Sequence, residues 1–378
     1  MKKIRVGIVG SGFIGVVHVE TLRRLGNIEV VALTDSNDAK AKADQMSIPY
    51  AFDNYKKMLD EVELDAIHIC TPNFTHYEIA MAAMEKGIHV LCEKPMAFTV
   101  DEALKMNEKA KEKGIVHGIN FHNRFYPVIN HLKYAIKENE LGEIFSIHGG
   151  YIQDWLLHQT DYSWRLLSKE SGKTRAVADI GSHWIDIVEF VTGLKAVEVF
   201  AEFKIVYEER LKPLKPIETF SKSKLSMDDY EKVPMDTEDV ACIMIRFDNG
   251  AIGNATIHQM FAGKKNKITV FIAGKNKSFE WDSDNSNNAV LGERDTWNHV
   301  ITKDASLLHP SSSSLSSYPG GHVEGFADAF KHGFKAFYDQ VSNPTLITDY
   351  ANFETGVRIM NICDKLYESA QTHTWVKL

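Results

Sequence analysis

The chain has 378 residues, 44% of them hydrophobic and 25% charged, which is the composition of a soluble globular protein and allows two domains of ordinary size. Its formal net charge of -8 leaves no surplus of lysine and arginine to neutralise phosphates, which argues against a nucleic-acid or anionic-membrane partner. No apolar run approaches the roughly 20 residues that a membrane-spanning helix needs.

The first 20 residues begin with basic and then apolar residues, as a signal peptide does. Arg5 and four glycines interrupt this stretch and no small-residue cleavage site follows, so we expect no signal peptide. The chain has four widely spaced cysteines and no C-x-x-C pair. Cysteines within apolar runs, such as Cys70 and Cys92, usually act as small hydrophobic residues. These features predict a protein of the reduced cytoplasm.

Strands and helices alternate through the first 120 residues. Near-continuous apolar runs, typical of strands buried on both faces, predict strands over 3–9, 28–35, 64–71, 88–92 and 115–121. Helices are predicted over 13–25, 75–86 and 99–113, with one more after Asp53, which we expect to cap it. Strands that alternate with helices through short connections predict a doubly wound parallel sheet. We assign residues 1–123 to this Rossmann-type domain.

The pattern changes after residue 123. Helices are predicted over about 127–140, 180–192, 322–341 and 350–370. Strands without intervening helices are predicted over 143–155, 196–206, 239–247, 250–260, 267–274 and 277–282. Polar stretches over 214–237 and 304–321 predict surface loops. We therefore predict an α/β protein whose second domain, 124–378, is an α+β unit with an open, mostly antiparallel sheet.

A glycine motif follows the first predicted strand. Gly10-x-Gly12-x-x-Gly15 allows a tight turn, a close approach of a pyrophosphate and close packing of helix on strand. Phe13 and Ile14 open the next helix, whose free N–H groups can receive the phosphates. A ligand-free glycine turn is the alternative. The position between strand and helix favours a dinucleotide site.

Asp35 ends the second predicted strand, 20 residues after Gly15. A carboxylate at this point can accept hydrogen bonds from the adenosine ribose hydroxyls and would repel a 2′-phosphate. The sequence therefore favours NAD over NADP, although Lys40 and Lys42 lie close by.

The segment "CTPNFTHYEIA" lies at the carboxyl end of a predicted strand, where doubly wound folds bind ligands. Asn73 and Thr75 can cap the following helix, which is the structural alternative for both. We expect Thr71, Asn73 and His76 to contact the cofactor.

Lys94 stands in "HVLCEKPMAF", at the end of another strand of the same predicted sheet. A lysine there can hydrogen-bond a substrate oxygen and stabilise negative charge that develops on it. The alternative is a solvated turn residue. Pro95 and the strand-end position favour a catalytic role for Lys94, in contact with both substrate and cofactor.

Asp179, His183 and Asp186 are spaced so that a helix would carry them on one face. A histidine one turn from a carboxylate can be oriented as a general base. The alternatives are a capping aspartate and a histidine of the core. A metal site on this face is possible, but no second group of ligands is evident, so we expect no metal. We predict Asp179 and His183 as catalytic and substrate-binding residues.

Two segments between these motifs, 120–127 and 149–165, are rich in amides, aromatic residues and arginines. An ordinary amphipathic strand with a loop is the alternative. Aromatic residues interleaved with amides favour a polyhydroxylated ligand. We expect Tyr151 and Gln153 to contact the substrate and Asn123, Trp164 and Arg165 to contact the cofactor.

The motifs "GSGFIG", "TPNFTH", "CEKP", "RFYP" and "DIGSHWID", in this order, resemble the glucose–fructose oxidoreductase/inositol dehydrogenase/MocA (Gfo/Idh/MocA) family over nearly the whole chain. The resemblance implies a Rossmann domain, an α/β domain with an open sheet, and assembly into dimers or tetramers through that sheet. It implies that Lys94, Asp179 and His183 are catalytic and that Glu93 contacts the cofactor. The segment 149–165 is similar to the levoglucosan dehydrogenase-like branch.

The functional hypothesis is a cytoplasmic, NAD(P)-dependent dehydrogenase that oxidises a secondary hydroxyl of a sugar or cyclitol. The alternatives are an NAD-binding sensor or scaffold without catalysis, and a metal-dependent sugar isomerase or lyase. A family member that recycles its nucleotide is a further alternative. The sequence leaves open the substrate, the carbon oxidised, the direction of the reaction and the oligomer size.

Overall fold

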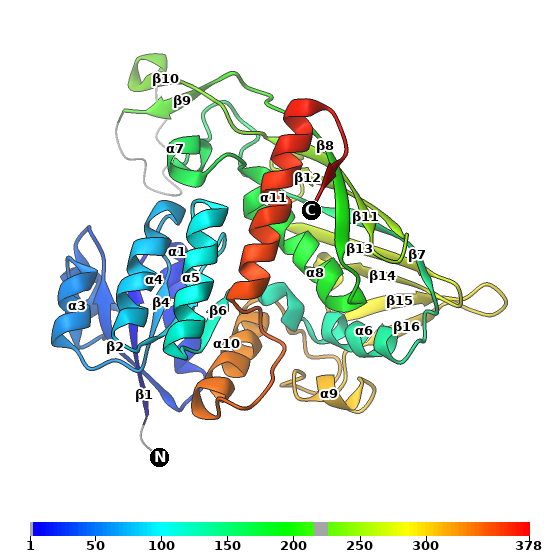
Figure 1. Cartoon of the computed structure of the whole chain (residues 1–378), viewed down its shortest axis with the longest axis horizontal. Coiled ribbons are helices and arrows are strands. Elements are labelled where there is room, and N and C mark those ends of the chain that lie inside the picture. Colours follow the sequence, from blue (N-terminus) through cyan, green and yellow to red (C-terminus); the bar gives the residue numbers. More distant parts are fainter. Residues whose placement is uncertain (1–2, 215–225) are drawn as a thin grey trace.

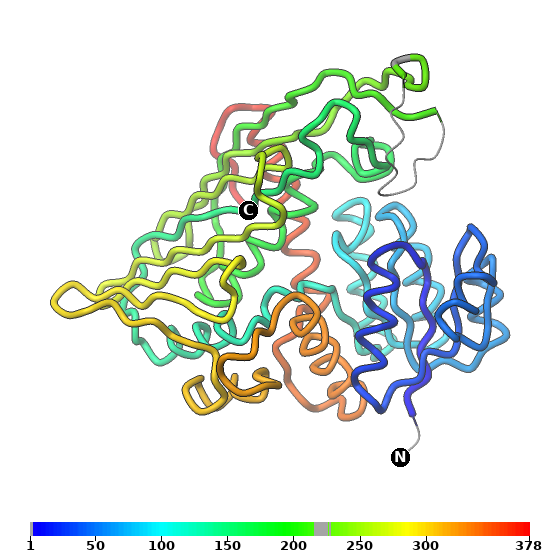
Figure 2. Tube along the Cα trace, turned by 180° about the vertical axis from the view of Figure 1, so that it is seen from behind, coloured from blue at the N-terminus to red at the C-terminus, as the bar shows by residue number. Residues whose placement is uncertain are grey.

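The computed structural model of the chain describes residues 3–214 and 226–378. Two sheets dominate the molecule, a parallel one near the N-terminus and a larger one formed mainly by residues 144–302 (Figure 1). Seen from behind, the two sheets lie on opposite sides of the last two long helices (Figure 2). Over the described residues, no helix has the length and apolar character to cross a bilayer.

The first sheet has six parallel strands in the order β3-β2-β1-β4-β5-β6. Their bounds, in sheet order, are Tyr50–Phe52, Ile28–Thr34, Ile4–Val9, Ala66–Ile69, His89–Cys92 and His117–Ile119. The strand order reverses between β1 and β4, and a parallel sheet binds its ligand beyond the carboxyl ends at such a point. The prediction of a doubly wound parallel sheet is confirmed.

Five helices accompany this sheet: α1 (Phe13–Arg23), α2 (Ala39–Gln45), α3 (Tyr55–Glu61), α4 (His76–Glu85) and α5 (Val100–Lys113). Thr99 and Glu102 form a capping box on α5, which ends at Gly114 in the left-handed conformation. The predicted cap of α3 is wrong by one residue. Asn54, not Asp53, accepts the hydrogen bond from the N–H of Lys56, because Asn54 is the last extended residue before the helix.

The second sheet has nine strands in the order β16-β15-β14-β13-β7-β12-β11-β8-β17. Every neighbouring pair is antiparallel except β7 and β12. Their bounds, in sheet order, are His299–Thr302, Asn288–Gly292, Ser278–Asp282, Lys267–Gly274, Ile144–Ile152, Ile252–His258, Val240–Phe247, Ala196–Lys204 and Val376–Lys377. The predicted open, mostly antiparallel sheet is confirmed.

Some short elements were not predicted. Strand β16 lies at the edge of the sheet, where few apolar side chains are required, and the five-residue strand β15 lies next to it. The predicted loop over 214–237 lies partly outside the described residues, and within them β10 (Tyr230–Pro234) pairs with β9 (Glu209–Pro213). The predicted loop over 304–321 contains one short helix, α9 (Pro310–Ser313).

One face of the second sheet is covered by α6 (Pro127–Lys137), α8 (Ser182–Thr192) and α11 (Phe353–Thr372), as Figure 1 shows. Inward side chains of the strands and the apolar sides of these helices form the main core. The opposite face has no helix over it among the described residues. A short helix, α7 (Ser168–Ser171), lies near the mouth of the cleft between the sheets.

Helix α10 (Phe326–Ser342) comes late in the chain but packs against α1 beside the parallel sheet. Its side chains Phe330, Phe334, Phe337 and Tyr338 belong to the same buried cluster as Val6 and Ile8 of β1. The N-terminal sheet is therefore completed by a helix from the other end of the chain.

Candidate active site

A cavity of about 630 Å³ lies beyond the carboxyl ends of the parallel strands and is closed on its other side by the second sheet. Phe13 of α1, Thr71 after β4 and Lys94 after β5 line it from the first sheet. Asp179 and His183 line it from the segment that leads into α8. The site therefore needs both halves of the molecule.

The glycine loop at one end of this cavity has the shape that a pyrophosphate needs. Gly10 has φ +92°, and a Cβ there would lie 2.8 Å from the carbonyl oxygen of Cys70. A Cβ on Gly15 would lie 2.1 Å from the carbonyl oxygen of Gly10. Beside Gly12 there is open space, and no side chain caps the N-terminus of α1. The first N–H groups of α1 are thus free for an anion, so these residues fit a dinucleotide.

Asp35 lies next to the glycine loop at the end of β2. Its Oδ2 accepts a hydrogen bond from the N–H of Ser11 at 2.9 Å, and its Oδ1 accepts one from the N–H of Asn37. The same Oδ1 forms an ion pair with Lys42 Nζ at 3.0 Å. Burial alone would raise the pKa of Asp35, but the hydrogen bonds from Ser11, Asn37 and Lys42 lower it below its ordinary value. The group beside the glycine loop is therefore an ionised carboxylate with a lysine next to it.

Lys94 reaches across the cavity to the other half of the molecule. Its Nζ lies 2.7 Å from Oδ1 and 2.8 Å from the main-chain oxygen of Asp179, and both side chains are mostly buried. Burial opposes ionisation of Asp179, but the charges of Lys94 and Arg165 outweigh it and lower its pKa. The result is a pre-positioned ammonium group whose remaining proton can face a ligand oxygen.

Behind Asp179 lies a buried polar chain that was not predicted from the sequence. Gln259 donates from Nε2 to Asp179 Oδ2 at 2.8 Å and accepts from Arg175 at 2.8 Å. Arg175 is in turn paired with Asp239. A sequence signal did exist, because Gln259 continues the inward-facing alternation of β12 and is a fully buried polar residue at a core position.

The helix that carries Asp179 and His183 does not begin as an α-helix. Residues Val177–Gly181 form a π-helical turn, and the α-helix starts at Ser182. Asp179 and His183 both line the cavity, but the prediction that Asp186 shares this face is wrong. Asp186 does not line the cavity, and its carboxylate is bound by Arg124, with Nε to Oδ2 at 2.7 Å. The described residues hold no group of three His, Cys, Asp or Glu side chains placed to share a metal ion.

His183 is nearly buried and lies edge-on to His122, with ring centroids 5.2 Å apart. The Nδ1 atom of each ring is buried without a hydrogen-bond partner among the described residues. No hydrogen bond joins His183 to Asp179 there either, although the sequence predicted that Asp179 would orient it. Burial, followed by the charge of Lys94, lowers the pKa of His183 well below its ordinary value, so its ring is neutral.

A family model described as an oxidoreductase family with an NAD-binding Rossmann fold (GFO_IDH_MocA) matches residues 4–121, and the model of its C-terminal alpha/beta domain matches residues 133–378. The chain belongs to the Gfo/Idh/MocA oxidoreductase family.

Among the relatives of this Gfo/Idh/MocA protein are known sugar dehydrogenases. Levoglucosan dehydrogenase of Pseudarthrobacter phenanthrenivorans is 27% identical, with 100% of this chain and 98% of the relative covered. Glucose-6-phosphate 3-dehydrogenase of Bacillus subtilis is 26% identical, with 97% of this chain and 96% of the relative covered. The solved structure of levoglucosan dehydrogenase in complex with NADH and L-sorbose matches with a TM-score of 0.88 and 26% identity. The match covers 100% of this chain and 99% of that structure's chain.

Most residues that the sequence predicted for the Gfo/Idh/MocA site lie together. The glycine loop and Asp35 stand at the dinucleotide end. The predicted residues that line the cavity itself are Phe13, Ile14, Thr71, Asn73, Glu93, Lys94, Tyr151, Gln153, Trp164, Arg165, Asp179 and His183. Residues that line it without having been predicted as contacts include His122, Trp155, Asn266 and Phe330.

Two predicted cofactor contacts lie elsewhere. His76 is buried, and its ring nitrogens lie 2.8 Å from the carbonyl oxygen of Thr71 and 2.9 Å from that of Pro95. The ring therefore ties two strand-end loops together, and in its neutral form it donates to one carbonyl at a time. Asn123 is buried in a short turn after β6 and does not line the cavity.

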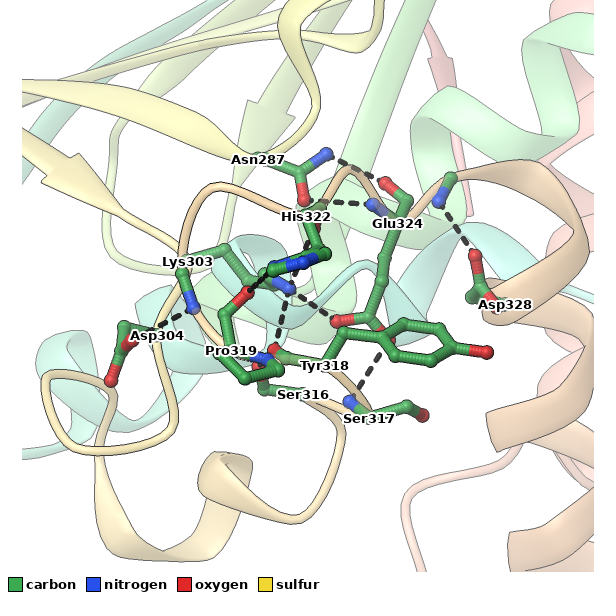
Figure 3. A network of polar contacts seen from close by, with 12 residues as sticks. Asn287, Lys303, Asp304, Ser316, Ser317, Tyr318, Pro319, His322, Glu324 and Asp328 are labelled. Atoms are coloured by element: carbon green, nitrogen blue, oxygen red, sulfur yellow. Dashed lines mark hydrogen bonds and ion pairs between the residues drawn. The ribbon is translucent and has the colours of Figure 1, made fainter.

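The segment before α10 is anchored by a buried ion pair. Lys303 Nζ binds Glu324 Oε2 at 2.5 Å and the main-chain oxygens of Tyr318 and His322, as Figure 3 shows. Helix α10 begins two residues later at Phe326, and Phe326 and Phe330 form part of the cavity wall. The network thus fixes where α10 starts relative to the cofactor end of the site.

Proposed function

We propose that this chain is a dehydrogenase that oxidises a secondary hydroxyl of a cyclic sugar or cyclitol by hydride transfer to a nicotinamide nucleotide. The observation that carries the proposal is the contact of Lys94 with Asp179 across the cavity, with Nζ 2.7 Å from Oδ1, beside the neutral ring of His183. A cation that can hold a hydroxyl oxygen and a neutral base that can take its proton are what this reaction requires.

Each of these residues has a proposed role. When bound, the nucleotide supplies the hydride acceptor. Lys94 holds the reacting oxygen and stabilises the charge that develops on it as the proton leaves. His183 accepts the hydroxyl proton, since burial keeps its ring neutral. Asp179 holds Lys94 in position from the opposite domain, which is a different role from the orientation of His183 that the sequence predicted.

The proposed substrate is a sugar-like ring. Tyr151 and Gln153 both bind Asn266 through their side chains, at 2.6 and 2.7 Å, so these polar groups form one rigid cluster on the cavity wall. Trp155 and Trp164 also line the cavity and offer flat apolar faces. Amide groups for hydroxyls and aromatic faces for C–H groups together suit a pyranose or cyclitol, in line with the relatives that act on levoglucosan and glucose 6-phosphate.

The proposed nucleotide is NAD rather than NADP. The ionised carboxylate of Asp35 would repel a 2′-phosphate and accept hydrogen bonds from a ribose diol. Lys42 is engaged with Asp35 at 3.0 Å, so it reduces this repulsion without offering a free cation to a phosphate. Relatives with NADH bound support the same choice.

The chain is further proposed to act in the cytoplasm as a homodimer or homotetramer. The support for assembly is the uncovered face of the second sheet, which exposes apolar side chains from neighbouring strands, Phe145, Val197, Met244 and Ile252. The four cysteines are unpaired, as in a reducing compartment.

The experiment that tests this function is a substrate panel. Levoglucosan, glucosides, glucose 6-phosphate and myo-inositol are incubated with NAD and NADP in parallel, and the absorbance of the reduced nicotinamide is followed. We expect at least one ring substrate to reduce NAD and to do so faster than NADP. No reduction with any member of the panel would contradict the proposal.

Lys94→Ala tests the catalytic assignment. We expect turnover to fall by a factor on the order of 10³, because charge on the reacting oxygen loses its main stabilising group. NADH binding, measured by fluorescence, should stay within a few-fold of the original protein. Lys105→Ala is the matched control, since Lys105 pairs with Asp101 on the outer surface of α5. Turnover of Lys94→Ala close to that of the control would rule out the assignment.

A further inference from the structure

Four polar side chains form an unbroken hydrogen-bonded chain through the apolar core beneath the cavity. His18 Nε2 lies 2.9 Å from Glu93 Oε1, His18 Nδ1 lies 2.8 Å from His68 Nδ1, and His68 Nε2 lies 2.8 Å from the hydroxyl of Tyr338. His18 and His68 are fully buried and Tyr338 is almost so. The four residues come from α1, β4, the end of β5 and α10, so their meeting depends on the whole fold.

The surroundings of this chain are apolar and aromatic. Phe334 packs edge-on to both imidazole rings, with centroids 4.7 and 4.8 Å away, and Phe330 packs against His18. Buried polar groups are costly unless each is paired, and aliphatic side chains would fill this space at less risk. A chain of paired polar groups in such a place therefore calls for an explanation beyond packing.

The direction of the hydrogen bonds follows from the Glu93 end. Burial would raise the pKa of Glu93, but hydrogen bonds from His18 and Asn120 and the charges of His18 and Lys94 lower it to about 2. The carboxylate is ionised and can only accept, so His18 donates from Nε2. When the His18 ring is neutral, its Nδ1 accepts, and it faces two donors, the Nδ1–H of His68 and, at 3.3 Å, the thiol of Cys70.

The remaining two bonds follow from the same logic. Burial, followed by the charge of His18, lowers the pKa of His68, so this ring is neutral and its Nε2 accepts when Nδ1 donates. Burial and the charge of Asp65 raise the pKa of Tyr338, so the phenol keeps its proton and donates to His68. With His18 in its neutral form, every hydrogen bond in the chain therefore points from Tyr338 toward Glu93.

Both ends of the chain reach a cavity. Glu93 lines the active-site cavity beside Lys94. Tyr338 lines a second cavity of about 370 Å³ between α10 and the segment that follows α1, together with Arg24, Lys331, His332, Lys335 and Asp339. A continuous hydrogen-bonded path thus runs from a residue that lines a surface cavity to a residue that lines the wall of the active site.

We propose that Tyr338, His68 and His18 form a proton relay that connects this surface cavity to Glu93 at the active site. A proton from water in the surface cavity binds the phenol oxygen while the phenol proton passes to His68 Nε2. The Nδ1 proton of His68 passes to His18 Nδ1, and the Nε2 proton of His18 passes to Glu93. One proton has then entered at Tyr338 and one has arrived at Glu93, with no electron moved.

The relay rests on the proposed dehydrogenase function, because reduction of a carbonyl in the site consumes one proton and oxidation of the alcohol releases one. This starting orientation carries a proton inward, as reduction of a carbonyl requires, and the reversed orientation that follows carries outward the proton that oxidation of an alcohol releases. Repeated passages in one direction require the imidazole and phenol hydrogens to return to the starting orientation between turnovers. Protonated Glu93 is a short-lived carrier, since a carboxyl group with a pKa of about 2 is protonated in about one molecule in 10⁵ at pH 7. Tyr338, His68 and His18 act through Glu93 and do not touch the substrate.

The first test needs neither substrate nor cofactor. Nitrogen-15 NMR of histidine-labelled protein reports which ring nitrogen of each imidazole carries the proton. We expect His18 to be protonated on Nε2 and His68 on Nδ1, with assignments made from His18→Gln and His68→Gln. His18 and His68 rings that are both protonated on Nε2 would overturn the relay, because no proton would then lie between their Nδ1 atoms, which are 2.8 Å apart.

The second test removes one hydroxyl. Tyr338→Phe keeps the ring and its packing but ends the path, so kcat should fall at least fivefold and the solvent deuterium isotope effect on kcat should rise. KM and the NADH dissociation constant should stay within twofold. Tyr350→Phe is the matched control, since this hydroxyl is also partly buried but binds Gln340, away from the relay. Equal kcat and isotope effects in the two variants would overturn the relay.

The two tests separate the relay from the function on which it rests. If the original protein oxidises no member of the panel, the dehydrogenase proposal fails, and the NMR experiment still decides whether the hydrogen bonds point toward Glu93. If the original protein is active and Tyr338→Phe matches its control, the relay fails and the dehydrogenase proposal stands.

Discussion

At the scale of single residues, Asp179 is held from two sides. Lys94 binds Oδ1 from the cavity and Gln259 binds Oδ2 from the core. A carboxylate that is fixed at both oxygens cannot rotate, so the ammonium group of Lys94 keeps one position relative to the reacting oxygen. Gln259 is therefore a positioning residue that acts through Asp179.

Gln259→Met tests this role. The substitution keeps the side-chain size but removes the bond to Asp179 and leaves Arg175 with one donor unpaired. We expect kcat to fall about tenfold with KM nearly unchanged, and the free energy of unfolding to fall by about 1–3 kcal/mol. Steady-state kinetics and urea unfolding measure both. Gln340→Met is the control, since Gln340 binds only Tyr350, away from the site. A loss of stability without a loss of kcat would contradict the positioning role.

Glu93 makes the stability of the protein depend on pH. Its folded pKa of about 2 lies below its ordinary value of 4.5, so its ionisation stabilises the fold above about pH 4.5, and this contribution is lost as the pH falls toward 2. The full contribution is about 3 kcal/mol. Between pH 5 and pH 3, urea unfolding should show a larger loss of stability in the original protein than in Glu93→Gln. If the free energy of unfolding fell equally with pH in the two proteins, this role of Glu93 would be contradicted.

The residues that sequence patterns could predict are those whose position follows from a local motif. Lys94 comes just after β5, and Gly10 and Gly12 come just after β1. The preceding strand therefore places each of them at the carboxyl edge of the parallel sheet, where such sheets bind ligands. Gln259 and His18 could not be assigned this way. Each acquires its side-chain partners only when segments 50 or more residues apart are packed together.

At the scale of elements, the start of α3 shows which of two neighbouring residues caps a helix. Asp53 and Asn54 are both good N-cap residues in isolation. The structure uses Asn54, whose side chain accepts from the N–H of Lys56 at 2.8 Å, while Asp53 is exposed and pairs with Lys57.

Asn54→Ala should therefore lower the free energy of unfolding by about 1 kcal/mol, through loss of the cap of α3. Asp53→Ala is the matched control and should change it by less than about 0.5 kcal/mol, since it loses only an exposed ion pair. Chemical denaturation of both variants decides between them. A larger loss in Asp53→Ala would mean that the sequence-based cap was right.

Long apolar or amphipathic elements were predictable and short edge elements were not. The strands of the parallel sheet and α5 are set by buried runs and by explicit caps. Strand β16 lies at an edge, and β9 and β10 form a separate pair, so their side chains carry little apolar alternation. Strand β15 is only five residues long. The π-helical turn at Val177–Gly181 left no mark in the sequence, and neither did the buried pair of Asp186 with Arg124, which comes from a distant segment.

At the scale of the whole molecule, the uncovered face of the nine-stranded sheet is the candidate assembly surface. Ile252 lies on a central strand of this face with 57% of its surface exposed. An exposed row of apolar side chains on an uncovered sheet is typical of a protein interface.

Ile252→Glu should dissociate the proposed oligomer, because a charge placed in a buried interface is costly. Size-exclusion chromatography with light scattering measures the mass. Ile347→Glu is the matched control, since Ile347 is 94% exposed in the loop between α10 and α11. A monomeric original protein, or an Ile252→Glu variant of unchanged mass, would contradict assembly through this face.

The position of helix α10 limits how the nucleotide-binding half of this protein can be cut out or exchanged. The parallel sheet looks like a module that ends near residue 123, yet Phe330, Phe334 and Phe337 from α10 fill part of its core. A gene fragment that stops after β6 would leave that apolar surface open to water. Chimaeras that exchange the nucleotide-binding half with a relative must therefore carry α10 with it, together with the Lys303–Glu324 anchor that sets its first turn.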